Sequence, residues 1–250
     1  MRYFLVLSIL ALTILGVSLQ MPVHAQALKK TQISEAEKAT FAFLKLSKAK
    51  PDYKSWIRAS KEYQNASKEE RLKIEELETH RLKWGFKEFS FEEDFLKITT
   101  NVQLQMKEKN EKGTAMLIFH FPHQDEDYIP YFPYAHAGLW ISLLVQDLPQ
   151  FARLKLTEEQ YVHIKKFLPN ENEIYDGKIT MRVRPVTADS TAPFKLDGVD
   201  QWLMMGDVAF LKCTTSDPQT KQEKDLWEYY APWYLTETEN FLLDELESKK

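Results

Sequence analysis

Cysteine is nearly absent from this 250-residue chain, which limits both its chemistry and the ways in which it can be stabilised. The one cysteine, Cys213, has no internal partner for a disulfide, so stability must come from the core. The apolar run that ends at this residue, from Val208, is typical of a strand. We therefore interpret Cys213 as a small buried hydrophobe rather than as a catalytic nucleophile.

The known fingerprints of nucleotide binding and of serine hydrolases are also missing. The sequence contains no G-x-x-x-x-G-K-[ST] loop, no G-x-G-x-x-G turn and no G-x-S-x-G elbow. It has no long basic run, and 33 basic against 37 acidic residues give a formal net charge of -4. Because the phosphates of nucleic acids are bound by clustered lysine and arginine, we predict no nucleic-acid partner.

The first 25 residues have the pattern of a secretory signal peptide. A basic residue, Arg2, precedes an apolar run from Tyr3 to Leu19, and Val23 and Ala25 provide the small residues of a cleavage site. The alternative is an uncleaved membrane anchor, for which the run is near the lower length limit. We predict cleavage after Ala25 and an exported bacterial protein, periplasmic or secreted, without stable membrane insertion.

Residues 26–84 are predicted to form a layer of three helices. Ser34 and Glu37 have the spacing of a capping box for a helix that ends near Ala49, and Ser67 and Glu70 repeat that spacing. Between them, Asp52 is placed to cap a second helix. Helical spacing assigns Tyr53, Trp56, Ile57 and Tyr63 to the second helix, and places Ile74, Leu77 and Arg81 on one side of the third. A strand is possible from Leu82 onward.

Residues 85–250 are predicted to form a sheet that makes one compact domain with the helices. The pattern alternates over 95–106 and 115–121, which predicts an antiparallel hairpin, and the apolar run 139–145 predicts a central strand buried on both faces. Further strands are expected at 178–184 and 202–214, with a helix from Thr157 between the two groups. The prediction is an α+β fold: a mostly antiparallel sheet of about five to seven strands, the N-terminal helical layer and a C-terminal helix after Thr236.

The insert from Pro122 to Ala137 is the segment with the clearest functional signal. It is too long and too aromatic for an ordinary solvated connection, and its three prolines reduce the entropy lost on ordering. We predict an ordered loop that contacts a partner, since rigid amphipathic rings are common at binding surfaces. The alternative is that the rings only cover the sheet. The predicted binding residues are Tyr128, Tyr131, Phe132, Tyr134 and Trp140, and a second aromatic group lies at 227–234.

The same region contains His120, His123 and His136, with acidic residues at 125–127. Histidines and acids are zinc ligands, which makes a zinc-dependent hydrolase the alternative function. Their spacing matches no specific motif, so we predict no metal and no other cofactor. Arg182 and Arg184 share one face of a predicted strand and would suit an anion, although simple alternation explains them equally well. The preferred hypothesis is a non-enzymatic envelope protein that binds a protein or a glycan.

Overall fold

The computed structural model describes residues 33–107, 114–121, 130–171, 173–196, 198–217 and 219–235. Within these ranges, α-helices α1–α4 precede an eight-stranded sheet, and α5 lies between β5 and β6. The predicted α+β class with a mostly antiparallel sheet is confirmed, with one strand more than the upper number expected. The predicted signal peptide and C-terminal helix fall outside the described residues, as do His123 and Tyr128.

Side-chain caps fix the starts of the N-terminal helices. Ser34 caps α1 (Glu35–Ser47): its hydroxyl accepts a hydrogen bond from the Glu37 amide at 3.2 Å, and the Glu37 carboxylate accepts one from the Ser34 amide at 2.9 Å. The predicted single second helix is wrong. It is divided into α2 (Tyr53–Ala59) and α3 (Lys61–Asn65), because Ser60 has extended backbone and its side chain caps α3.

The fourth helix, α4 (Lys68–Glu88), continues through Gly85, so no strand begins at Leu82. A Cβ atom at Gly85 would lie 2.8 Å from Ile33 Cδ1 and 3.2 Å from Phe41 Cε2, so glycine allows α1 to approach α4 closely. Leu77, predicted on the inner side, is 69% exposed. Among the helices that the structure describes, none has the length and apolarity needed to cross a lipid bilayer.

The sheet pairs its strands in the order β3-β4-β7-β6-β1-β2-β5, and β8 pairs with the far end of β7. The described pairings are antiparallel except that of β4 with β7. The predicted hairpin is confirmed as β1 and β2, in register from Gln103 opposite His120. The strands are β1 (Leu96–Lys107), β2 (Ala115–His120), β3 (Tyr131–His136), β4 (Leu139–Val145), β5 (Arg153–Leu156), β6 (Ile174–Leu196), β7 (Val199–Ser216) and β8 (Glu223–Tyr230).

Two predictions about the sheet are wrong. Residues 131–136, predicted to be in a loop, form the edge strand β3, and β4 is therefore second from the edge rather than central. The predicted burial of β4 on both faces is correct at its middle residues 141–143. Its parallel pairing with β7 is fixed just beyond the strand, where the Asp147 carboxylate accepts hydrogen bonds from the Val208 amide at 3.0 and 3.1 Å.

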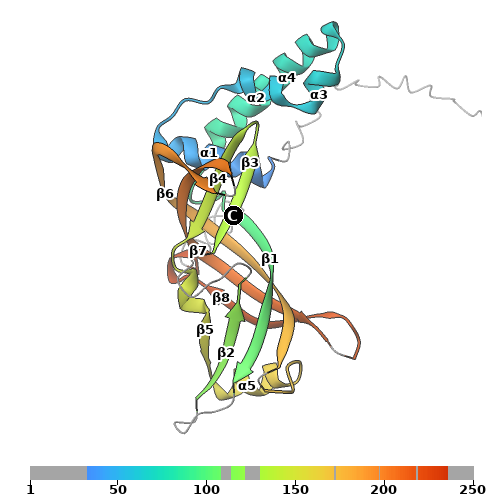
Figure 1. Cartoon of the computed structure of the whole chain (residues 1–250), viewed down its shortest axis with the longest axis vertical. Helices are drawn as coiled ribbons and strands as arrows, with labels where there is room; N and C mark the ends of the chain where they lie inside the picture. Colours follow the sequence, from blue (N-terminus) through green and yellow to red (C-terminus); the bar gives the residue numbers. More distant parts are fainter. Residues whose placement is uncertain are drawn as a thin grey trace, which may run out of the picture. The chain divides into compact units, whose positions relative to one another are not determined.

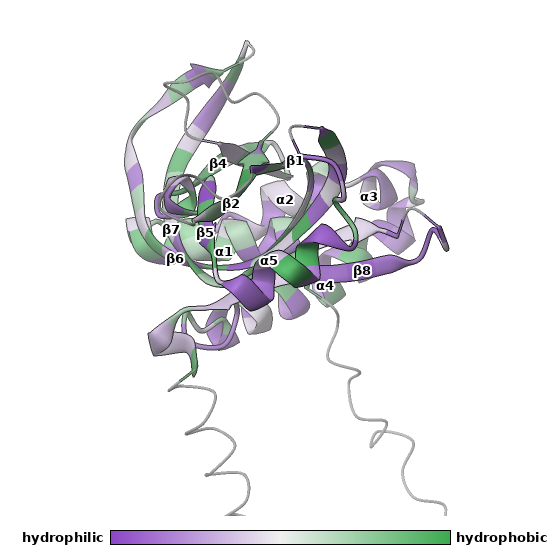
Figure 2. Ribbon diagram, turned by 90° about the horizontal axis from the view of Figure 1, so that it is seen from below, coloured by the Kyte–Doolittle hydropathy of each residue, from purple (hydrophilic) through white to green (hydrophobic). Residues whose placement is uncertain are grey.

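The long strand β7 passes between β4 and β6 at Gly206, which lies opposite Val145 on one side and Pro185 on the other. Alternating hydrophilic and hydrophobic residues along β6 and β7 can be followed in Figure 2. A Cβ atom at Gly206 would lie 2.6 Å from Val183 Cγ1 and 2.8 Å from the carbonyl oxygen of Arg184. Backbone cannot move aside as a flexible side chain can.

We expect Gly206→Ala to lower the free energy of unfolding by about 1–3 kcal/mol, as overpacking does. Urea denaturation of the purified protein measures this as a lower midpoint with an unchanged slope. Ser190→Ala, on the exposed part of β6, is the control and should change stability by less than about 0.5 kcal/mol. A Gly206→Ala variant as stable as this control would contradict the close approach.

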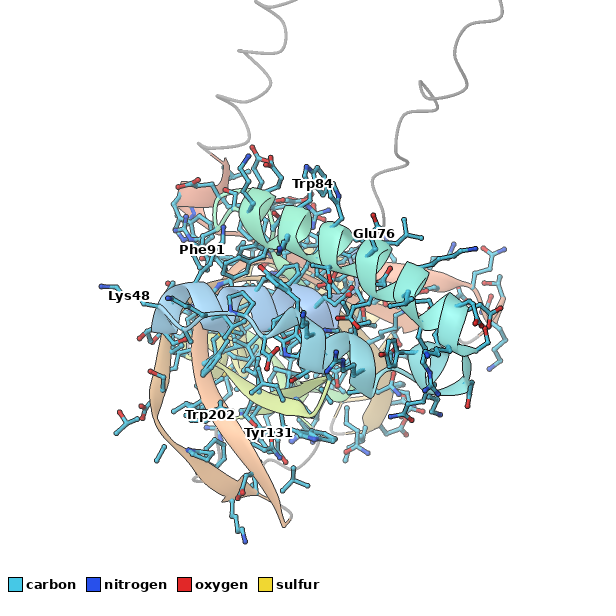
Figure 3. The ribbon with its side chains drawn as sticks, turned by 90° about the horizontal axis from the view of Figure 1, so that it is seen from above. Lys48, Glu76, Trp84, Phe91, Tyr131 and Trp202 are labelled. Atoms are coloured by element: carbon cyan, nitrogen blue, oxygen red, sulfur yellow. The ribbon has the colours of Figure 1, made fainter. Side chains whose placement is uncertain are left out.

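The helix layer joins the sheet through α1. This helix contacts β6, β3, β1 and β4, and the Glu35 carboxylate accepts a hydrogen bond from the Lys97 amide at 2.7 Å where β1 begins. In Figure 3, α4 with the labelled Glu76 and Trp84 lies on the other side of α1 from the strands that carry Tyr131 and Trp202. The buried residues of helices and strands form one continuous core.

At the other end of the sheet, curvature brings β8 towards β2. The rings of Phe119 and Trp227 lie 6.3 Å apart, and Phe151 of η2 (Leu148–Phe151) is 4.7 Å from Tyr229, although β8 pairs only with β7 among the described strands. The helix α5 (Glu158–Lys165), capped as predicted by Thr157, lies at this end, away from α1–α4 (Figure 1).

Candidate functional site

The candidate site is the β3–β4 hairpin, which contains four of the five predicted binding residues. A two-residue turn joins the strands, and both turn residues, Ala137 and Gly138, have positive φ, at 50° and 84°. Such turns match the right-handed twist of the paired strands. Since neighbouring residues in a strand point to opposite faces, the hairpin divides the candidate residues between an inner face, towards α1, and an outer face.

The inner face holds Phe132, Tyr134 and His136. Phe132 and Tyr134 pack against the core, as do their cross-strand partners Leu143 and Ile141, and burial raises the pKa of the Tyr134 phenol well above its ordinary value. This packing favours the architectural alternative for two of the predicted binding residues.

The outer face holds Tyr131 and Trp140. Tyr131 is half-buried, and Trp140 is 38% exposed. Leu144, opposite Tyr131, and Leu203, beside Ser142 on β7, have the same parity and are also partly exposed. The exposed margin of the outer face is therefore lined by apolar and aromatic side chains.

A buried polar contact lies within this apolar face. The Ser142 hydroxyl donates a hydrogen bond to the Gln201 side-chain carbonyl at 2.5 Å, and both residues are buried. A buried hydrogen bond of this kind favours one arrangement of two neighbouring strands, because slippage would leave both groups unpaired. It therefore holds the outer face of β4 in fixed register with β7.

Pro133 lies at the middle of β3, on the edge of the sheet. Counting from the turn, its pair with Ser142 is one of those in which backbone groups point away from the partner strand. A proline has no N–H to present there, so it makes the outer edge of β3 a poor template for another strand. The edge of β3 is therefore less suited to pairing with a further strand than a proline-free edge would be.

The structure does not bring His120 and His136 together. They end β2 and β3, between which four strands intervene in the sheet, and His120 is exposed whereas His136 is partly buried. Within the described ranges, no group of three or more His, Cys, Asp or Glu residues is arranged to hold a metal ion. His123, the third candidate ligand, is outside those ranges.

A polar network that the sequence did not predict lies near His136, on which two of its members, Glu37 and Arg81, act electrostatically. Glu37 of α1 pairs with Arg81 of α4 at 2.5 Å, and Arg81 also pairs with Glu78 at 2.8 Å. Burial would raise the pKa of Glu37, but hydrogen bonds from Arg81 and Ser34 outweigh it and lower that pKa. The capping box identified Glu37, but no sequence signal linked it to Arg81, 44 residues later.

The second aromatic group, at 227–234, packs the last described part of the chain against the sheet. The guanidinium of Arg184 lies 3.5 Å from the centre of the Trp233 ring, and Arg182 donates a hydrogen bond to the Tyr234 hydroxyl at 2.7 Å. Phe95 stacks on Trp233 with ring centres 6.3 Å apart. The arginine pair thus shares a face as predicted, and its described contacts are with aromatic side chains of the same chain.

Cys213 is fully buried in β7, and burial raises the pKa of its thiol to about 12. Since the thiolate is the reactive form, this environment suits packing and not nucleophilic attack. A separate polar hollow lies between β1, β6, β7 and β8, and two of its charged lining residues pair with each other: Lys178 lies 3.0 Å from Glu223, which also accepts a hydrogen bond from the Thr214 hydroxyl at 2.6 Å.

Comparison with known proteins gave no match: no family model, no curated protein and no solved structure resembles this chain.

Proposed function

We propose that this chain is a non-enzymatic binding protein of the bacterial envelope, exported through residues 1–25 to the periplasm or beyond. Its partner, an envelope protein or glycan, would contact the outer face of the β3–β4 hairpin. The observation that supports this proposal is Trp140, a large aromatic residue that is 38% exposed on a hairpin whose other rings are partly buried. Exposed aromatics in fixed positions bury area on binding at little entropic cost.

The rigidity of the hairpin adds to the argument. Phe132 and Tyr134 anchor one face in the core, so the strand that carries Tyr131 and the strand that carries Trp140 are held in place before any partner arrives. A surface that is already ordered loses less conformational entropy on binding. The competing function, a hydrolase around 120–136, receives no support from the described residues, in which His120 and His136 lie on separate strands.

The test is site-specific photo-crosslinking in cells that export the full chain. A photo-reactive phenylalanine analogue replaces Trp140, and the control carries it at Lys155, which is exposed on the opposite edge strand β5. We expect cross-linked adducts at position 140 and few at 155. If the partner is a protein, the analogue placed at Tyr131 should form an adduct that Trp140→Ser removes. If the partner is the glycan of the envelope, Trp140→Ser should prevent co-sedimentation of the chain with purified peptidoglycan. Equal labelling at 140 and 155 would contradict a binding role for the hairpin.

Export is tested separately by intact-mass measurement of the exported protein. We expect a chain that begins at Gln26 and stays in the aqueous fraction, because residues 1–25 have the pattern of a cleaved leader. A chain that keeps these residues and partitions into membranes would make 3–19 an anchor and would contradict this part of the proposal.

A further inference from the structure

The tip of the β3–β4 hairpin is joined to α2 by a ring contact. His136, the last residue of β3, meets Trp56 edge-on, with ring centres 5.5 Å apart and planes at 76°. Tyr53 supports Trp56 from within α2, at 5.6 Å. The other main contacts of α2 are with α4 and α3, so this pair of rings connects the outer helices to the edge of the sheet.

The surroundings of His136 disfavour its protonated, positively charged form. Its Nε2 atom is buried and has no hydrogen-bond partner among the described residues. Two charged groups act on it: Glu37 from α1, which favours protonation, and Arg81 from α4, which opposes it. Burial has the largest effect and, together with Arg81, lowers the pKa of His136 below its ordinary value of 6.5 in spite of Glu37.

The nearby tyrosine hydroxyls would not offset a positive charge on His136. The pKa values of Tyr53 on α2 and Tyr134 on β3 are both raised by burial, so both stay neutral. The Glu37 carboxylate already accepts hydrogen bonds from Arg81 and from the amide and hydroxyl of Ser34. A proton added to His136 would therefore place a second positive charge beside Arg81 without a new acceptor for the buried N–H.

We propose that the contact between His136 and Trp56 is an acid-sensitive latch that holds α2 against the hairpin when His136 is neutral and loosens when it is protonated. The sign follows from linkage: a histidine with a lowered pKa in the folded state contributes stability above the unfolded value of 6.5. That contribution is lost as the pH falls below 6.5 towards the lower folded value. The latch does not depend on the proposed binding function.

The test is hydrogen–deuterium exchange of the full chain, followed by mass spectrometry of α2 peptides at about pH 7.5 and about pH 5, with intrinsic rates corrected. At the lower pH Glu37 remains ionised, because its pKa lies below 4.5. In the wild type we expect the opening equilibrium of α2 to rise about threefold or more on acidification, while peptides from the centre of β6 do not change.

His136→Phe keeps a ring against Trp56 but cannot titrate, so its α2 protection should not depend on pH. His136→Gln, smaller and also non-titrating, gives the same comparison if the phenylalanine variant fails to fold. His80→Phe is the histidine control, since His80 is exposed on α4, and it should keep the wild-type pH response. The latch is rejected if α2 of the wild type does not respond to pH, or if both His136 variants respond as the wild type does.

Discussion

Phe41→Ala is expected to lower the free energy of unfolding by about 3–5 kcal/mol, among the largest effects of any single change in this chain. The side chain is fully buried in α1, where its ring lies 5.7 Å from that of Phe86 and 6.5 Å from that of Phe89. Gly85 leaves room for the Phe41 ring against α4, so truncation opens a cavity between the helices that neither backbone can close.

Urea denaturation of the full chain measures this loss as a lower midpoint with an unchanged slope. The matched control is Phe194→Ala: Phe194 is 37% exposed on β6, and its truncation should cost less than about 1 kcal/mol. If the two variants proved equally stable, α1 would not be packed between α4 and the sheet as described.

The helix starts could be predicted from the sequence because they depend on residues three apart. The caps of α1, α4 and α5 at Ser34, Ser67 and Thr157 follow directly from that spacing. The division between α2 and α3 was missed because Ser60 reads equally well as a helix residue or as a cap, and only its extended backbone decides the matter.

The edge strand β3 was missed because three features of this segment are more typical of loops than of strands. Pro133 and a high density of aromatic residues suggested an irregular insert, and the turn at Ala137 and Gly138 is not one of the strongest hairpin pairs. Proline is tolerated at an edge, however, where its missing N–H leaves no ladder bond unmade. Alternation from Tyr131 to His136 would have been the better guide.

The candidate site was predictable in part. Aromatic content identified the hairpin, but not which rings face the core, because that depends on the turn register and on the position of α1. The contact of His136 with Trp56 and the pairing of Glu37 with Arg81 join segments far apart in the chain, and composition and periodicity carry no information about such pairs.

Glu37→Gln is expected to lower the free energy of unfolding by about 2–3 kcal/mol at neutral pH. The carboxylate and Arg81 are 8% and 19% exposed as side chains, so removing one charge leaves the other poorly solvated between α1 and α4. The loss is set below that of a fully buried pair because Arg81 keeps some contact with water and with Glu78. Lys54→Met, which breaks an exposed pair with Glu75 at 3.9 Å, should cost under about 0.5 kcal/mol.

A double-mutant cycle with Arg81→Met isolates the pair, and we expect a coupling energy of about 1–3 kcal/mol from urea denaturation of the four proteins. The pH dependence gives an independent check. Because the folded pKa of Glu37 is lowered from 4.5, its contribution is present above that value and is lost as the pH falls through the lower folded value. The wild type should therefore lose stability relative to Glu37→Gln as the pH falls below 4.5. Parallel stability curves for the two proteins, or a coupling energy near zero, would show that α1 and α4 are held together by Phe41 and its neighbours alone.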